Sequence, residues 1–132
     1  MAQPSTDANP FGYSEAVWRL FNQAPRAGAF APGTAGVVAG TAQSNAAHAV
    51  LRIELQLAGG RVADSRFRAY GCPTTIAVGA WLAGWSLGRT VAELRALGAA
   101  DLRAALEFSD DRAHCGLLGE DALRNALEKL QR

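Results

Sequence analysis

Alternation of apolar and polar side chains marks two strands in the middle of the chain. In residues 51–57 four aliphatic side chains alternate strictly with charged or amide side chains, which predicts a strand with one face on a core and the other in water. Residues 58–60 read Ala-Gly-Gly, a turn signal, and residues 61–70 alternate again with Ala63 on the core side. The two segments are therefore expected to pair as an antiparallel hairpin, with the Gly-broken residues 33–43 as an edge strand.

From Pro73 onward the apolar residues recur at helical spacing. The nearly apolar residues 76–87 predict a buried helix with Trp81 and Trp85 in the core. Further helices are expected where a good N-cap residue or apolar spacing occurs, which is after Ser14, after Thr90, over residues 100–106 and over residues 118–130. Strands followed by helices predict an α+β fold, a small antiparallel sheet of about three strands with helices packed on one face.

Length and composition indicate one soluble domain. Residues 13–132 are long enough to fold by their own core, whereas the polar residues 1–12 are predicted to form a disordered tail. A formal net charge of +1 gives the protein no overall electrostatic field that would attract nucleic acid or an anionic membrane. The apolar run over residues 76–85 is about half the length that a membrane-spanning helix needs. Two cysteines without an apolar leader predict reduced thiols and a cytoplasmic protein.

The candidate chemistry lies in two cysteines and their neighbours. Cys72 ends the hairpin directly before Pro73, a residue favoured at the first helical position, so Cys72 is predicted to be a helix N-cap with its sulfur at the positive end of the helix dipole. His114 and Cys115 lie side by side at the expected start of the last helix. A thiolate at such a place can bind a metal or accept sulfur; the alternative is that both cysteines are small buried hydrophobic residues.

Three blocks of sequence carry a resemblance to a known family. They are Tyr13-Ser14-Glu15, the run Asp-Ser-Arg-Phe-Arg-Ala-Tyr-Gly-Cys over residues 64–72, and His114-Cys115 followed by Glu120-Asp121-Ala122. Together they resemble the iron-sulfur cluster assembly scaffold proteins, the family of IscU and the N-terminal domain of NifU. The resemblance runs from about Tyr13 to the C-terminus and implies an IscU/SufE-like fold of the kind predicted above. It also implies that Cys72, His114 and Cys115 are ligands of iron or of a 2Fe-2S cluster, with zinc as another metal.

The chain departs from the family pattern at the first ligand. The family has Cys-Gly-Asp just before its first long strand, and the matching positions here are Ala47, His48 and Ala49. By this resemblance the chain looks like a divergent member that lacks the first ligand Cys and the Asp. A two-iron cluster ordinarily needs four protein ligands, and His48, one position from the missing Cys, is a candidate for the fourth. The alternative is an ordinary loop histidine.

The leading hypothesis that follows from the resemblance is a scaffold-like protein that accepts sulfur from a cysteine desulfurase, or holds a labile iron, zinc or 2Fe-2S site. An iron donor and apo iron-sulfur acceptor proteins are further expected partners. Residues 108–112 replace the Leu-Pro-Pro-Val-Lys motif of members served by a dedicated chaperone, so chaperone binding is not expected. We expect Cys115, ahead of Cys72, to take up sulfur. The alternative is a non-catalytic adaptor or regulator of a desulfurase.

No independent enzyme activity is expected. Neighbouring helical residues such as His114 and Cys115 point about a hundred degrees apart, and no third group that would orient a base is evident in the sequence.

Overall fold

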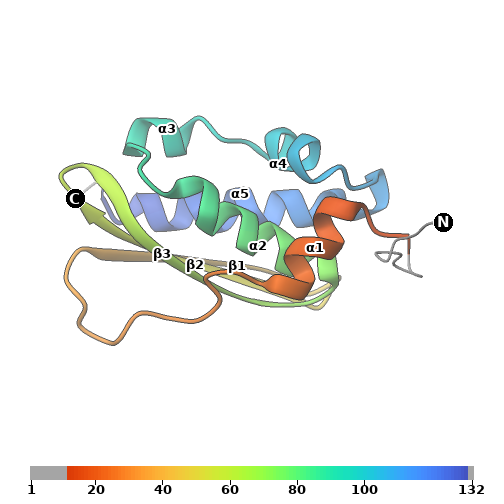
Figure 1. The fold of residues 1–132 in the computed structure, drawn as a ribbon, viewed down its shortest axis with the longest axis horizontal. Coiled ribbons are helices and arrows are strands. Elements are labelled where there is room, and N and C mark those ends of the chain that lie inside the picture. The colour runs from red at the N-terminus through yellow and green to blue at the C-terminus, as the bar shows by residue number, and fades with distance from the viewer. Residues whose placement is uncertain (1–11, 131–132) are drawn as a thin grey trace.

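The computed structural model describes residues 12–130, so almost all of the tail predicted for residues 1–12 lies outside the described part. The elements follow one another as α1 (Glu15–Gln23), β1 (Val37–Ser44), β2 (Ala49–Ala58), β3 (Arg61–Tyr70), α2 (Pro73–Ser86), α3 (Val91–Arg95), α4 (Ala99–Leu106), the 3-10 helix η1 (Asp110–Arg112) and α5 (Ala113–Glu128). The three strands form one antiparallel sheet in the order β1-β2-β3, and α2 and α5 cover one face of it (Figure 1). The predicted α+β fold is confirmed.

The hairpin of β2 and β3 forms where the alternation predicted it, but one β-bulge changes its phase. Pairing runs from Val50↔Tyr70 to Gln56↔Asp64, and after an irregularity between Gln56 and Leu57 it continues as Leu57↔Val62. A shift of one residue moves the following side chains to the opposite face of the sheet. Val62 is therefore buried, and Ala63, expected on the core side, is exposed.

The polar face of β2 is also less open to water than the alternation predicted. Residues 24–36, between α1 and β1, run below the sheet in Figure 1, and the Phe30 N–H donates to Glu54 Oε1 at 2.9 Å. Arg52 pairs with the other carboxylate oxygen at 2.9 Å. Burial alone would raise the pKa of Glu54, but these donors, together with Arg68, lower it. Glu54 is thus a buried, paired carboxylate rather than a solvated one.

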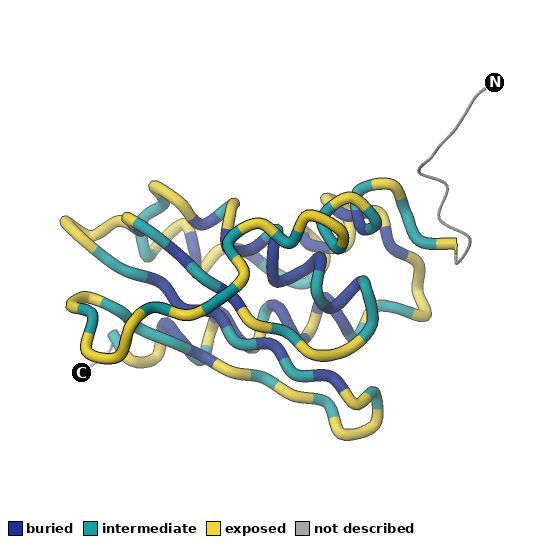
Figure 2. Tube along the Cα trace, turned by 60° about the horizontal axis from the view of Figure 1, so that its bottom comes forward, coloured by how far each residue is buried: buried dark blue, intermediate teal, exposed yellow. Residues whose placement is uncertain are grey.

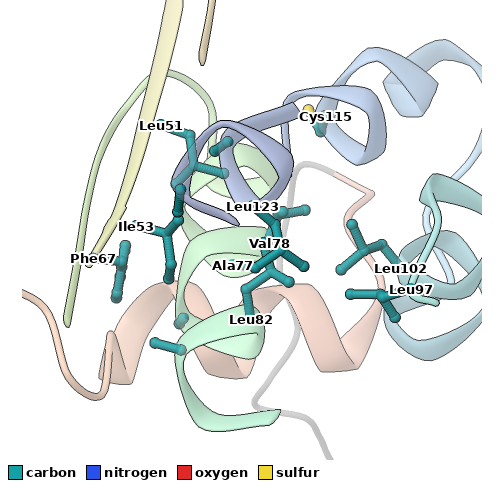
Figure 3. Packing of buried hydrophobic residues seen from close by; sticks show 14 of the residues in the cluster. Leu51, Ile53, Phe67, Ala77, Val78, Leu82, Leu97, Leu102, Cys115 and Leu123 are labelled. Carbon is teal, nitrogen blue, oxygen red and sulfur yellow. The ribbon is translucent and has the colours of Figure 1, made fainter. Parts of the chain in front are cut away.

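The core lies between the sheet and the two long helices. Leu51 and Ile53 of the sheet face Val78 and Leu82 of α2 and Leu123 of α5, as Figure 3 shows. Figure 2 shows the buried stretches of the chain in dark blue, interrupted by intermediate and exposed ones. One close approach depends on a glycine. A Cβ added at Gly40 would lie 2.2 Å from the backbone of both Ala122 and Ala126, so only glycine allows β1 and α5 to pack this closely. None of the described helices is long and apolar enough to cross a membrane.

Trp81 and Trp85 are not core residues, contrary to the prediction. Both are half-buried, and their rings stack with centroids 5.7 Å apart over a hollow that Leu97 of the α3–α4 connection also lines. Arg89 lies over the Trp85 ring, with its guanidinium carbon 4.2 Å from the ring centre. The smaller residues of α2, such as Ala77 and Val78, fill the core instead.

Candidate functional site

The junction between β3 and α2 positions Cys72. Gly71 has a φ of +148°, a backbone conformation that L side chains rarely adopt, and it turns the chain out of the strand. Pro73 then begins α2, and Cys72 is the N-cap of that helix, as the sequence predicted. Cys72 is half-buried, so solvent reaches it.

The start of α5 meets the start of α2. His114 and Cys115 lie in the first turn of α5, and the Cys115 Sγ is 3.9 Å from the Cys72 Sγ and 3.5 Å from the His114 Nε2. Cys115 has no exposed surface and lies at the margin of the hydrophobic cluster (Figure 3). The structure therefore brings together three of the four residues predicted for the site, with Cys72 as the accessible sulfur of the pair.

The two thiols hold one negative charge between them. The Cys72 sulfur accepts a hydrogen bond from Cys115 and, despite its burial, also from the N–H groups of Thr75 and Thr74 at the start of α2, and these donors lower the pKa of Cys72 to about 4. The same pairing, with burial, raises the pKa of Cys115 far above its ordinary value. The Thr75 Oγ1 lies 3.4 Å from the Cys115 Sγ and 3.7 Å from the Cys72 Sγ. These contacts favour the thiolate on Cys72 and the protonated thiol on Cys115.

Arg112 belongs to this site, although the sequence analysis did not single it out. It is the N-cap of α5, where it donates to the Tyr13 hydroxyl at 2.8 Å with its guanidinium carbon 4.3 Å from the centre of the Tyr13 ring. The Tyr13 hydrogen bond and the neighbouring Cys72 sulfur raise the pKa of Arg112. The sequence did contain a signal for Arg112. A cation at a helix N-terminus is unfavourable next to the positive end of the helix dipole, so its presence there indicates a nearby anion.

Two of the three distances between the donor atoms fit a tetrahedral metal ion. Metal–sulfur bonds near 2.3 Å and metal–nitrogen bonds near 2.0–2.1 Å place two sulfurs about 3.8 Å apart, and a sulfur and a nitrogen about 3.5 Å apart. The distances here, 3.9 Å between Cys72 and Cys115 and 3.5 Å between Cys115 and His114, agree. Within residues 12–130, however, no three or more His, Cys, Asp or Glu side chains are grouped as a metal site. The structure shows a two-sulfur pair with an adjoining imidazole.

The structure does not bring His48 to the cysteine pair. His48 has a φ of +53° and lines a separate shallow hollow with Asn45 and Tyr70, among others. Its neighbour Ala49 is closer to the site: Ala49 is 2% exposed, and its Cβ and the Thr75 Oγ1 each lie 3.1 Å from the position of a Cβ added at Gly71. The position matched to the Asp of the family therefore adjoins the site, but it carries only a methyl group.

Comparisons with known proteins agree with this architecture. The family model for the NifU-like N terminal domain matches residues 12–132. The iron-sulfur cluster assembly scaffold protein IscU of Escherichia coli K12 is 28% identical over 116 residues, covering 87% of this chain and 91% of that protein. Iron-sulfur cluster assembly protein 2 of Arabidopsis thaliana is 26% identical over 126 residues, covering 91% and 77%.

Two solved structures share the fold. The N-terminal part of a NifU-like protein from Brucella abortus superposes with a TM-score of 0.71 at 20% identity, covering 89% of this chain and 93% of its own. A scaffold protein described for the SUF system of Fervidobacterium islandicum gives a TM-score of 0.67 at 19% identity, covering 87% and 96%.

Proposed function

Because this chain belongs to the family of NifU-like N-terminal domains, we propose that it is a scaffold-like protein of iron-sulfur cluster assembly that accepts sulfur at Cys72 and holds a metal ion transiently at the Cys72–Cys115 pair. One observation carries the proposal: the two sulfurs lie 3.9 Å apart at the starts of two helices, one accessible and one buried. The accessible sulfur is the one that can accept sulfur from a donor, and the pair supplies two sulfur ligands for a metal.

Cys72, rather than Cys115, is the proposed sulfur acceptor. The nucleophile in sulfur transfer is a thiolate that a donor can reach. Cys72 meets both conditions, since it is half-buried and its pKa is lowered to about 4, whereas Cys115 is fully buried and its pKa is raised. This reverses the order expected from the sequence. The proposed donor is the persulfide of a cysteine desulfurase.

The metal is proposed to be cargo rather than a permanent part of the fold. Cys72 and Cys115 would supply two thiolates and His114 a nitrogen, which leaves one tetrahedral position open. Iron, zinc or a 2Fe-2S cluster held this way would be labile and available to an apo acceptor protein. An iron donor or the partner protein itself would supply the missing fourth ligand. His48 could supply it only if its loop rearranged.

A second candidate function is an adaptor that regulates a desulfurase without carrying iron. It is favoured by Ala47 and Ala49, which stand where the family keeps a Cys and an Asp, and by the lack of a three-ligand group among residues 12–130. Metal and sulfide content of anaerobically purified protein separates the two, because an adaptor would bind neither.

The test of sulfur acceptance uses two matched variants. Reduced, chelator-treated Cys115→Ser and Cys72→Ser proteins are incubated anaerobically with a cysteine desulfurase and cysteine, alkylated and analysed by mass spectrometry. We expect one added sulfur on Cys72 in the first variant and none in the second. Sulfur on Cys115 in the second variant, with none on Cys72 in the first, would reverse the assignment, and no added sulfur in either would support the adaptor.

A further inference from the structure

We propose that the cysteine pair also releases the accepted sulfur, with Cys115 as a resolving thiol that displaces hydrosulfide and leaves a Cys72–Cys115 disulfide. The proposal rests on the proposed function, because it starts from a persulfide on Cys72. The proposal adds one activity to the proposed function, which is that the chain itself reduces the sulfur that it has accepted.

Burial gives the two cysteines different tasks. Cys115 has no exposed surface, so an external donor or acceptor cannot reach it, yet its sulfur lies 3.9 Å from that of Cys72. A donor in solvent reaches Cys72, the accessible sulfur of the pair, whereas the buried Cys115 adjoins that sulfur from the interior. Displacement at a disulfide-type sulfur needs the attacking and leaving sulfurs on opposite sides of the sulfur under attack, and these two approaches to Cys72 would provide that.

The competing reaction is passage of the delivered sulfur from Cys72 to Cys115. It would require attack on the outer sulfur, on the far side of Cys72, and would leave a charged persulfide in a fully buried place. Burying an unpaired charge is costly, so attack on the inner sulfur is favoured. The chain has no third cysteine that competes for Cys72, since the two thiols of the pair are its only ones.

The step balances within the chain. Cys72–S–S⁻ and Cys115–SH give Cys72–S–S–Cys115 and HS⁻: the bond between Cys72 and the delivered sulfur breaks as the bond between the two cysteines forms. The delivered sulfur takes the electron pair and is reduced to the sulfide level, while the two cysteine sulfurs are oxidised to a disulfide. Cys115 attacks as a thiolate: the His114 Nε2, 3.5 Å from the Cys115 Sγ, takes the Cys115 proton and passes it to the departing sulfur, which leaves as HS⁻. An external dithiol reductant must restore the pair before a second cycle.

The experiment is a single turnover without added reductant. Reduced, metal-free wild type and Cys115→Ser are loaded with glutathione persulfide, desalted anaerobically, and followed by intact mass and by sulfide in solution. We expect wild type to lose the added sulfur, gain a Cys72–Cys115 disulfide and release one sulfide per chain, while Cys115→Ser keeps its persulfide on Cys72. Cys115→Ala, a second variant without the thiol, guards against misfolding of the first and should behave like it.

Each other outcome contradicts the proposal in a distinguishable way. If wild type keeps the Cys72 persulfide as long as Cys115→Ser does, Cys115 is not a resolving thiol, although sulfur acceptance stands. If the sulfur moves to Cys115, the pair relays sulfur rather than reducing it. If neither protein takes up sulfur, sulfur acceptance at Cys72 fails as well, and the proposal falls with it.

Discussion

Replacing Cys115 should raise the pKa of Cys72, because the Cys115 hydrogen bond is the largest single cause of the lowered value. A hydrogen bond to a charged group contributes about 1.5–3 kcal/mol, and one pKa unit corresponds to about 1.4 kcal/mol. Cys115→Ala should therefore raise the pKa of Cys72 from about 4 by about 1–2 units. Cys115→Ser keeps an O–H donor in the same place, so its Cys72 should titrate close to wild type.

The assay is the rate of alkylation of Cys72 by iodoacetamide as a function of pH, in metal-free protein. The rate should follow the thiolate fraction, with its midpoint displaced upward in Cys115→Ala alone. If the alanine and serine variants share the wild-type midpoint, the thiol of Cys115 does not stabilise the thiolate, and the reasoning is wrong. The sign for stability follows as well. Since folding lowers the pKa of Cys72, its contribution to stability is complete above its ordinary pKa of 9.0 and is lost as the pH falls through about 4.

Three other predictions concern packing and the altered loop. Gly40→Ala should destabilise the fold by about 1–3 kcal/mol in chemical denaturation, because its Cβ would meet the α5 backbone, whereas Gly84→Ala, with nothing within 4 Å, should be neutral or stabilising; equal effects would contradict the close approach. His48→Gly should stabilise by up to about 1 kcal/mol, because it removes a side chain from a positive-φ position, while metal affinity stays unchanged; a loss of bound metal would instead identify His48 as a ligand. Ala47→Cys with Ala49→Asp should lengthen the lifetime of a reconstituted cluster, followed by its visible absorption, and an unchanged lifetime would mean that this loop does not reach the site.

Local signals predicted the parts of the site that depend on a few neighbouring residues. Gly71-Cys72-Pro73 is a strand end, an N-cap and a helix start in succession, and the structure has all three. Periodicity could not predict that Cys72 and Cys115 lie close together, because their proximity depends on how α2 and α5 pack. Only the family resemblance implied it.

The predictions that failed depend on contacts between distant segments. Glu54 is buried because residues 24–36 return beneath the sheet, and alternation along β2 carries no information about that loop. Ala63 is exposed because a bulge shifts the register of β3. Arg112 was overlooked because its partners, Tyr13 and Cys72, are far from it in sequence.

The account depends most on Cys72 and Cys115 acting as one two-thiolate site, and a cadmium titration tests this directly. Reduced, chelator-treated protein is titrated with Cd²⁺, and the ultraviolet thiolate-to-cadmium charge-transfer absorption is recorded for wild type, Cys72→Ser and Cys115→Ser. We predict one Cd²⁺ per chain in wild type, with about twice the absorption change of either single variant and much tighter binding than in either. If the wild-type signal matches that of one of the single variants in intensity and affinity, the two sulfurs do not share a metal, and the central claim is contradicted.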